Sequence, residues 1–314
     1  MDRRNFIGAL GGFAIIGCSP RGTTAPAPAA AVAAGPSPAV HRLEIGGSIL
    51  HVHTQGRDSL PIDMLAPWVA QSAAMIATYY GGALPVPGLD IALLASSGSR
   101  VGFGMHQDGR WIRVYYGRHC STETLARDWV MVHEMLHATF PDLPDRHRWM
   151  QEGLSTYLEP IVRARAGATT DAEVWRRWTA SMEHGRPGHG DRGLDRTHTW
   201  GRTYWGGTLF WLVADVRLRE TTNGAQSIRD VVTHIAGMGG NGRAQWSTSK
   251  VVAEADRATG TTIVSSLYAE LALAPGDVDL PALWAKLGVR AEGDSVVLDD
   301  DAPLAALRQA ITRA

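Results

Sequence analysis

The sequence predicts an α+β fold, in which a small mixed sheet lobe is followed by a mostly helical lobe. Between residues 41 and 118, several segments alternate polar and apolar residues, as half-buried strands do. From residue 119 to residue 314, apolar residues instead recur at the three-to-four spacing of helices. A His-Glu-Met-Leu-His segment at residues 133–137 stands just after the change of pattern. We therefore expect a site where the two lobes meet.

The composition indicates a folded protein without an electrostatic preference for nucleic acid. The chain has 314 residues, of which 45% are hydrophobic and 19% charged, enough for a well-filled core. Lys and Arg number 30 and Asp and Glu 31, which gives a net charge of -1. A chain so close to neutral offers no general attraction to nucleic acid or to an anionic membrane surface. We expect no nucleic-acid partner.

Residues 1–18 resemble a twin-arginine lipoprotein signal. Arg3 and Arg4 precede an apolar run, residues 6–16, that is too short to span a bilayer as a helix. The run ends in Ile-Ile-Gly-Cys18, which is similar to a bacterial lipobox, where the cysteine becomes the acylated first residue. The resemblance implies export to the cell envelope and a membrane anchor at lipidated Cys18, facing the periplasm. Ser19 favours sorting to an outer membrane, and an ordinary signal peptide with a chance cysteine is the alternative.

The stretch after the signal is expected to be a tether. Residues 19–40 consist mainly of Ala, Pro, Gly and Thr and contain almost no charge, so they cannot bury a core. Cys120 is then the single cysteine of the mature chain. This count excludes an intrachain disulfide and a zinc site built on cysteines.

The first lobe is expected over residues 41–118. Two alternating segments flank Gly46-Gly47 and are predicted to pair as strands. A helix follows, and then buried or β-branched segments that favour further strands. The expected strands are 42–45, 49–53, 89–94 and 111–116, and the expected helix is 62–80.

Two helices are expected to carry the site in the second lobe, residues 119–314. The first begins at a cap on Ser121 or the threonine after it and ends before Pro141. The second carries Glu152, and Gly153 allows a neighbour to approach closely. Pro160 either kinks this second helix or starts the next one.

The rest of the chain is predicted to be mostly helical. An open, His- and Gly-rich loop from His184 to Gly201 interrupts it. We expect this loop to be a mobile flap over the cleft; the alternative is a second metal site formed by its histidines. The expected helices are 172–182, 204–219, 227–236, 250–259, 264–273, 280–287 and 303–311.

His133, His137 and Glu152 form a candidate metal site. Residues four apart share one face of a helix, so the two imidazoles can bind the same ion. Glu152, after fourteen intervening residues, is the expected third ligand, with Asp142 and Asp145 as rival carboxylates. Three such ligands and one open position are typical of a catalytic zinc site. The sequence therefore predicts one Zn²⁺ per chain.

Two further residues are expected to act in catalysis. Glu134, next to the first ligand, is expected to accept a proton as water attacks a carbonyl and to pass it to the leaving amine. Tyr204 is the candidate donor to the developing oxyanion, because a phenol is neutral and donates without competing for the metal. Asp128 and Glu159 are candidate partners of the ligand histidines.

The motif segments resemble the gluzincin metallopeptidases, which include thermolysin and aminopeptidase N. The resemblance is carried by residues 133–137 and by Trp-Met-Gln-Glu-Gly-Leu-Ser-Thr-Tyr at 149–157. Residues 202–219 and 227–232 are similar to the glycyl aminopeptidase-like branch. Over about residues 100–240, the resemblance implies a thermolysin-like zincin catalytic domain, bound zinc and a peptide or protein substrate. It also implies that Tyr204 polarises the scissile carbonyl.

The sequence departs from the aminopeptidases of this group at one element. They carry a Gly-x-Met-Glu-Asn/His element whose glutamate holds the free amine of the substrate, whereas residues 102–107 are Gly-Phe-Gly-Met-His-Gln. His106 is expected at the surface, with contact to substrate as the alternative. Two alternative functions are a binding or assembly lipoprotein that kept the zinc fold, and a zinc hydrolase of a non-peptide amide or ester.

Overall fold

The computed structural model describes residues 40–56 and 58–313. The predicted export signal and all of the predicted tether except Val40 lie outside these residues. Within the described part, none of the helices combines the length and the hydropathy that crossing a membrane requires.

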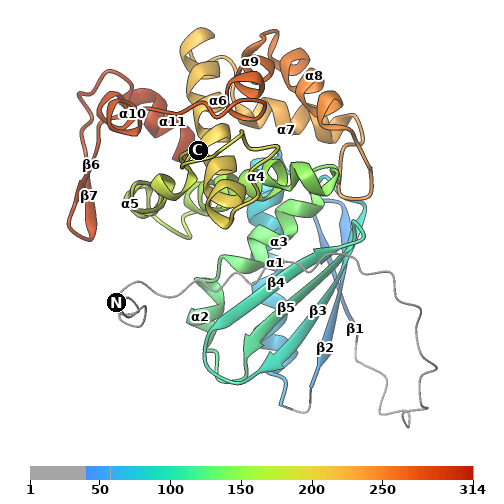
Figure 1. The fold of residues 1–314 in the computed structure, drawn as a ribbon. Helices are drawn as coiled ribbons and strands as arrows, with labels where there is room; N and C mark the ends of the chain where they lie inside the picture. The colour runs from blue at the N-terminus through green and yellow to red at the C-terminus, as the bar shows by residue number, and fades with distance from the viewer. Residues whose placement is uncertain (1–39, 57, 314) are drawn as a thin grey trace. The chain divides into compact units, whose positions relative to one another are not determined.

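A five-stranded mixed sheet forms the first lobe (Figure 1). The spatial order is β1-β2-β3-β5-β4, with β2–β3 and β3–β5 parallel and the two outer pairs antiparallel. β4 is therefore an edge strand. The strands are β1 (Val40–Ile45), β2 (Ser48–Gln55), β3 (Gly88–Ser96), β4 (Val101–Gln107) and β5 (Trp111–Gly117).

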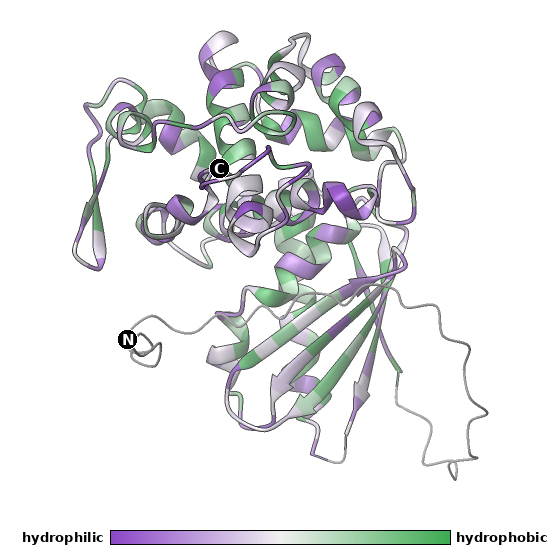
Figure 2. Cartoon of the chain, viewed as in Figure 1, coloured by the Kyte–Doolittle hydropathy of each residue, from purple (hydrophilic) through white to green (hydrophobic). Residues whose placement is uncertain are grey.

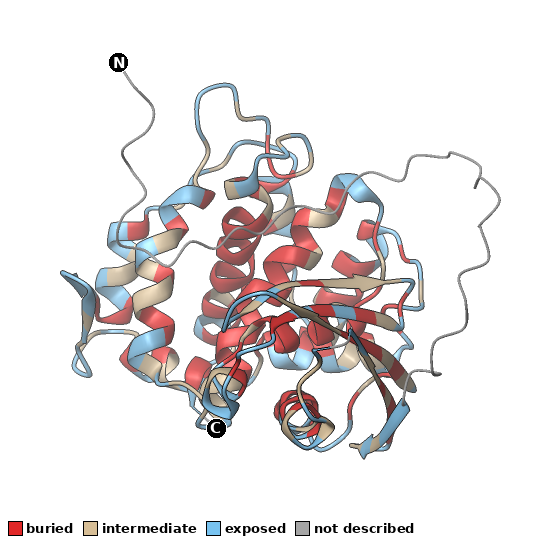
Figure 3. Cartoon of the chain, turned by 90° about the horizontal axis from the view of Figure 1, so that it is seen from below, coloured by how far each residue is buried: buried red, intermediate tan, exposed pale blue. Residues whose placement is uncertain are grey.

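One face of the sheet is buried under helices. Along β2, buried Leu50 and Val52 alternate with half-buried His51 and His53, and hydrophobic and hydrophilic residues likewise alternate along the strands in Figure 2. This alternation is typical of a sheet with one covered face. α1 (Ile62–Tyr79) packs against β1 and has buried apolar residues such as Leu65, Val69 and Ile76. Buried residues concentrate in the central helices (Figure 3).

The second lobe is mostly helical, and the expected α+β fold is confirmed. It also contains a small antiparallel hairpin, β6–β7, which is not among the expected strands. The elements are α2 (Thr122–Ala126), α3 (Val130–Ala138), η1 (Asp145–His147), α4 (Arg148–Arg165), α5 (Asp171–Ser181), η2 (Met182–Gly185), η3 (Arg202–Gly206), α6 (Gly207–Thr221), α7 (Ile228–Gly237), α8 (Thr248–Thr259), α9 (Ile263–Leu271), α10 (Leu280–Leu287), β6 (Val289–Glu292), β7 (Ser295–Leu298) and α11 (Ala305–Thr312).

The helix expected between Ser121 and Pro141 is in fact two helices. Ser121 does act as a cap, because its hydroxyl accepts from the Thr124 amide at 3.1 Å, but α2 ends at Ala126. The Asp128 carboxylate then accepts from the amides of Val130 and Met131, at 3.0 and 2.9 Å. These bonds satisfy the first amides of a new helix, so α3 starts at residue 130.

Pro160 lies inside α4, which continues to Arg165, so the alternative in which this proline starts the next helix is wrong.

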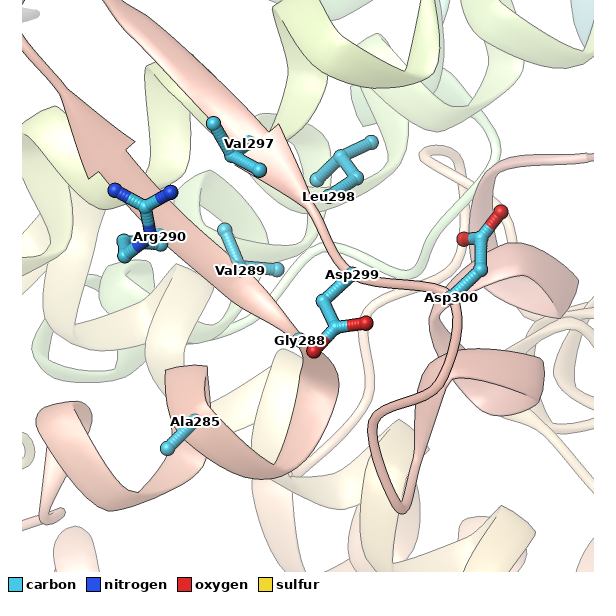
Figure 4. A pocket seen from close by; sticks show the side chains of 8 residues that line it. All are labelled: Ala285, Gly288, Val289, Arg290, Val297, Leu298, Asp299 and Asp300. Atoms are coloured by element: carbon cyan, nitrogen blue, oxygen red, sulfur yellow. The ribbon is translucent and has the colours of Figure 1, made fainter.

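A hollow of about 540 Å³ lies between α10 and the β6–β7 hairpin (Figure 4). Its lining includes Arg290, Val297 and Asp299 and none of the three candidate metal ligands.

Candidate metal centre

Three side chains from two helices converge on one point. The Nε2 atoms of His133 and His137 are 3.2 Å apart, and Glu152 Oε2 lies 3.4 and 3.2 Å from them. An ion with bonds of about 2.1 Å at tetrahedral angles separates its ligand atoms by roughly 3.4 Å. The three atoms therefore fit one tetrahedral Zn²⁺. Among the described residues, this is the group of His, Cys, Asp and Glu side chains with such a spacing.

The helices explain why these side chains meet. The histidines lie one turn apart on α3, and Glu152 lies in the second turn of α4. Arg148, one turn before Glu152, places Nε and Nη2 each 3.1 Å from Glu152 Oε1, which turns the other oxygen toward the histidines. Burial alone would raise the pKa of Glu152, but the two histidines hold it well below its ordinary value.

The two rival carboxylates are elsewhere. Asp142 forms an isolated bridge with Gln245, and Asp145 is exposed on η1. Of the three carboxylates considered from sequence, the structure brings Glu152 to the histidines.

Glu134 is buried against the edge strand β4. Burial raises the pKa of its carboxyl, and the two ligand histidines and a hydrogen bond from the His106 backbone oppose this rise. A Cβ atom on Gly104 would lie 2.5 Å from Glu134 Cγ and 2.7 Å from Val130 Cγ1. The glycine therefore lets the strand approach the helix closely enough to hold the carboxylate. A buried carboxyl with a raised pKa suits a group that first accepts and then donates a proton.

His106 is half-buried rather than fully exposed, which corrects in part the expectation of a surface residue. Its ring is stacked on that of His137, with centroids 6.2 Å apart and an interplanar angle of 16°. Burial lowers its pKa to about 3, so the ring is neutral at physiological pH. The alternation of polar and apolar residues along β4 shows which side chains share a face. It does not show that this face packs against α3, which comes later in the chain. The proposed contact of His106 with substrate stays a prediction.

Tyr204 lies in η3, a short π-helix that opens into α6. Single π-helical turns occur often at functional sites. Gly207, the residue after the turn, packs directly on α4, since a Cβ atom on Gly153 would lie 2.3 Å from Gly207 Cα. Tyr204 is 7% exposed, and its ring centroid lies 6.3 Å from that of Trp200. Its role as oxyanion donor stays a prediction.

The loop expected to be an open flap is anchored at its centre. Asp195 accepts from His147 Nδ1 and from Trp149 Nε1, each at 2.8 Å, and from the Tyr268 hydroxyl. Farther back, Asp191 forms a buried ion pair of 2.9 Å with Arg202. The prediction of an open loop is therefore wrong for this stretch, and its histidines form no metal cluster among the described residues.

Asp128 and Glu159 were predicted to be partners of the ligand histidines, and this prediction is wrong, because both carboxylates bind other groups. Asp128 caps α3, as described above. Glu159 is fully buried and pairs with two arginines, Arg163 and Arg177. Both carboxylates therefore act on the scaffold of the site.

Comparison with known proteins supports the fold. No family model and no curated protein matches the sequence. The structure is similar to that of an aminopeptidase N family protein from Idiomarina loihiensis, with 13% identity and a TM-score of 0.61, over 81% of this chain and 49% of that one. A second similar structure, an M1 zinc metallopeptidase from Deinococcus radiodurans, has 16% identity and a TM-score of 0.48, over 77% of this chain and 53% of that one.

The chain thus spans about half the length of the solved structures it matches. At 13% identity, the first similarity shows the fold, and it confirms the kind of fold that the resemblance to gluzincins implied.

Proposed function

We propose that the protein is a zinc-dependent metallopeptidase that hydrolyses peptide bonds in the cell envelope. The observation that carries this proposal is the triangle of His133, His137 and Glu152, with ligand atoms 3.2 to 3.4 Å apart and Glu134 buried beside it. A site kept only to stabilise the fold needs no buried carboxylate next to its ligands. The similarity to an aminopeptidase N family protein supports the same reaction class.

The chain contributes a base, a donor and three ligands to this reaction. His133, His137 and Glu152 would hold Zn²⁺, which as a Lewis acid polarises a substrate carbonyl and acidifies water. The Glu134 carboxylate accepts the proton of the attacking water and then donates it to the leaving amine. The Tyr204 hydroxyl donates a hydrogen bond to the carbonyl oxygen as negative charge develops there.

The proposed location depends on the first eighteen residues. The paired arginines and the Gly-Cys18 sequence support export and acylation of Cys18. The domain would then work from a membrane surface, on peptides or proteins of the envelope.

Glu134→Gln tests the mechanism. The amide cannot accept the proton, so kcat should fall by roughly 10²- to 10⁴-fold while one zinc stays bound per chain. Glu123→Gln is a matched control, because Glu123 is exposed on α2 and pairs with Arg127 at 2.9 Å. Full activity of the Glu134→Gln variant would refute the mechanism.

Peptides with free and with blocked N-termini identify the mode of cleavage. On the edge strand β4, His106 occupies the position at which the aminopeptidases of the resembled group carry the glutamate that binds the substrate's amine. We therefore expect blocked peptides to be cleaved as well as free ones. Tight zinc binding without cleavage of any peptide, amide or ester would instead favour the binding lipoprotein.

A further inference from the structure

Arg177 on α5 lies between two tryptophans that flank the proposed site. Its Cζ atom is 5.3 Å from the ring centroid of Trp129 and 6.0 Å from that of Trp205. Both distances are within the range of a cation–π contact. Trp129 immediately precedes α3, and Trp205 immediately follows Tyr204 in the π-helical turn. One guanidinium therefore touches the start of the ligand helix and the turn that holds the candidate donor.

Trp129 in turn packs against a metal ligand. Its ring meets that of His133 edge to face, with centroids 5.7 Å apart and an interplanar angle of 82°. A ligand histidine is usually oriented by a hydrogen bond from its second ring nitrogen. His133 Nδ1 is buried and has no hydrogen-bond partner among the described residues. The orientation of this imidazole therefore depends on the rings packed around it.

Arg177 is held in place from the buried side. Glu159, which is 0% exposed, receives Arg177 Nη1 at 2.5 Å and Arg163 Nη1 at 2.9 Å. Arg163 Nη2 also donates to the Arg127 carbonyl at 2.9 Å, on the connector that leads into Trp129. A buried carboxylate with two arginine partners thus fixes both the guanidinium and the chain beneath the tryptophan.

We infer that Arg177 is a positioning residue of the metal centre, which orients His133 through Trp129 and the Tyr204 turn through Trp205. This inference rests on the proposed function, since it assigns Arg177 to the same site. Without the guanidinium, Trp129 and Trp205 lose their common partner and the His133 ring loses its support. Metal affinity and kcat should fall together, while KM changes little because Arg177 need not touch substrate.

Arg177→Met and Arg177→Lys test this role in the whole domain. We expect Arg177→Met to weaken Zn²⁺ binding by about 10- to 100-fold, as loss of an orienting partner of a ligand does, in competition with a chelator. It should also alter the visible spectrum of the Co²⁺-substituted protein and lower kcat, with KM within about twofold of wild type. Arg177→Lys, which keeps the cation, should recover part of both losses. Arg176→Met is the matched control, because Arg176 is the preceding residue on α5 and pairs with exposed Glu173 at 2.7 Å.

A double-mutant cycle that combines Arg177→Met with Trp129→Leu tests whether Arg177 acts on the metal centre through Trp129. If Arg177 acts on the metal through Trp129, the double variant should bind Zn²⁺ no more weakly than the worse single variant. Additive losses would overturn that route. An Arg177→Met protein with wild-type Zn²⁺ affinity and an unchanged Co²⁺ spectrum would overturn the inference, even if its melting temperature fell. Zn²⁺ affinity and the Co²⁺ spectrum can be measured without peptidase activity, so they test the role of Arg177 alone. The proposed function fails separately, if the wild-type protein cleaves no peptide.

Discussion

At the scale of the residue, Gly104 shows how closely the edge strand is fitted to the carboxylate of Glu134, the proposed base. A methyl group there would lie 2.5 Å from Glu134 Cγ and 2.9 Å from its Oε1. Gly104→Ala must therefore displace the base, and a misplacement of about 1 Å can cost roughly 10²-fold in rate. We expect kcat to fall at least about tenfold while zinc stays bound, since no metal ligand is touched. Steady-state kinetics with metal analysis of the same sample measures both quantities.

Gly102 provides the control on the same strand. A methyl group at this exposed position would have the Tyr115 carbonyl oxygen, at 3.7 Å, as its nearest neighbour. Gly102→Ala should therefore keep the wild-type kcat. Equal losses in the two variants would mean that strand propensity, rather than contact with Glu134, determines the effect.

The convergence of the two candidate histidine ligands could be predicted from sequence because their geometry is local. A spacing of four on one helix places His133 and His137 together whatever surrounds them. Glu152 required more, since its approach depends on how α4 packs against α3, and the Trp-x-x-Glu-Gly context supplied that information. The stacking of His106 on His137 could not be predicted, because it joins a strand to a helix that come together only in the folded chain.

At the scale of the element, capping residues are ambiguous in sequence. Ser121 and Asp128 are both good N-caps, and the apolar periodicity continues across both. The prediction used the first and missed the second, so α2 and α3 were merged. The π-helical turn around Tyr204 was also missed, since no periodicity distinguishes it from the start of an α-helix.

Gly153 and Gly207 set the distance between α4 and α6. A Cβ atom on Gly153 would lie 2.3 Å from both the Cα and the carbonyl carbon of Gly207, which are backbone atoms that cannot rotate away. Gly153→Ala should therefore push the helices apart, shift Glu152 relative to the Tyr204 turn, and destabilise the fold by about 1–3 kcal/mol. Denaturant unfolding and Zn²⁺ competition should both show the loss.

Gly237 is a suitable control for that substitution. It ends α7, and a Cβ atom there would have no neighbour within 4 Å. Gly237→Ala should leave Zn²⁺ affinity unchanged and the free energy of unfolding equal or slightly higher. If Gly153→Ala likewise left Zn²⁺ affinity and the free energy of unfolding unchanged, the contact between α4 and α6 would be able to accommodate the added methyl group.

At the scale of the whole molecule, the order of lobes could be predicted and the order of strands could not. The segments with a period of two lie before about residue 119, and helical spacing predominates after it, although one helix, 62–80, falls within the first lobe. The sheet order β1-β2-β3-β5-β4 requires β4 to fold back beside β5 at the edge. It also places β5, rather than the preceding β4, beside β3 and parallel to it, a pairing of strands that are not consecutive in the chain.

Metal binding should stabilise the entire domain, because the ion would link α3 to α4 and α4 contacts α6 at Gly153. A ligand at about 1,000 times its Kd stabilises a fold by about 4 kcal/mol, and each kcal/mol shifts the melting temperature of a large domain by about 2 °C. A strong chelator should therefore lower the melting temperature by about 8 °C, and added Zn²⁺ should restore it. Glu134→Gln should keep this response, whereas His137→Ala should melt low with or without chelator. A wild-type melting temperature indifferent to chelator and to Zn²⁺ would show that the three side chains do not hold a metal.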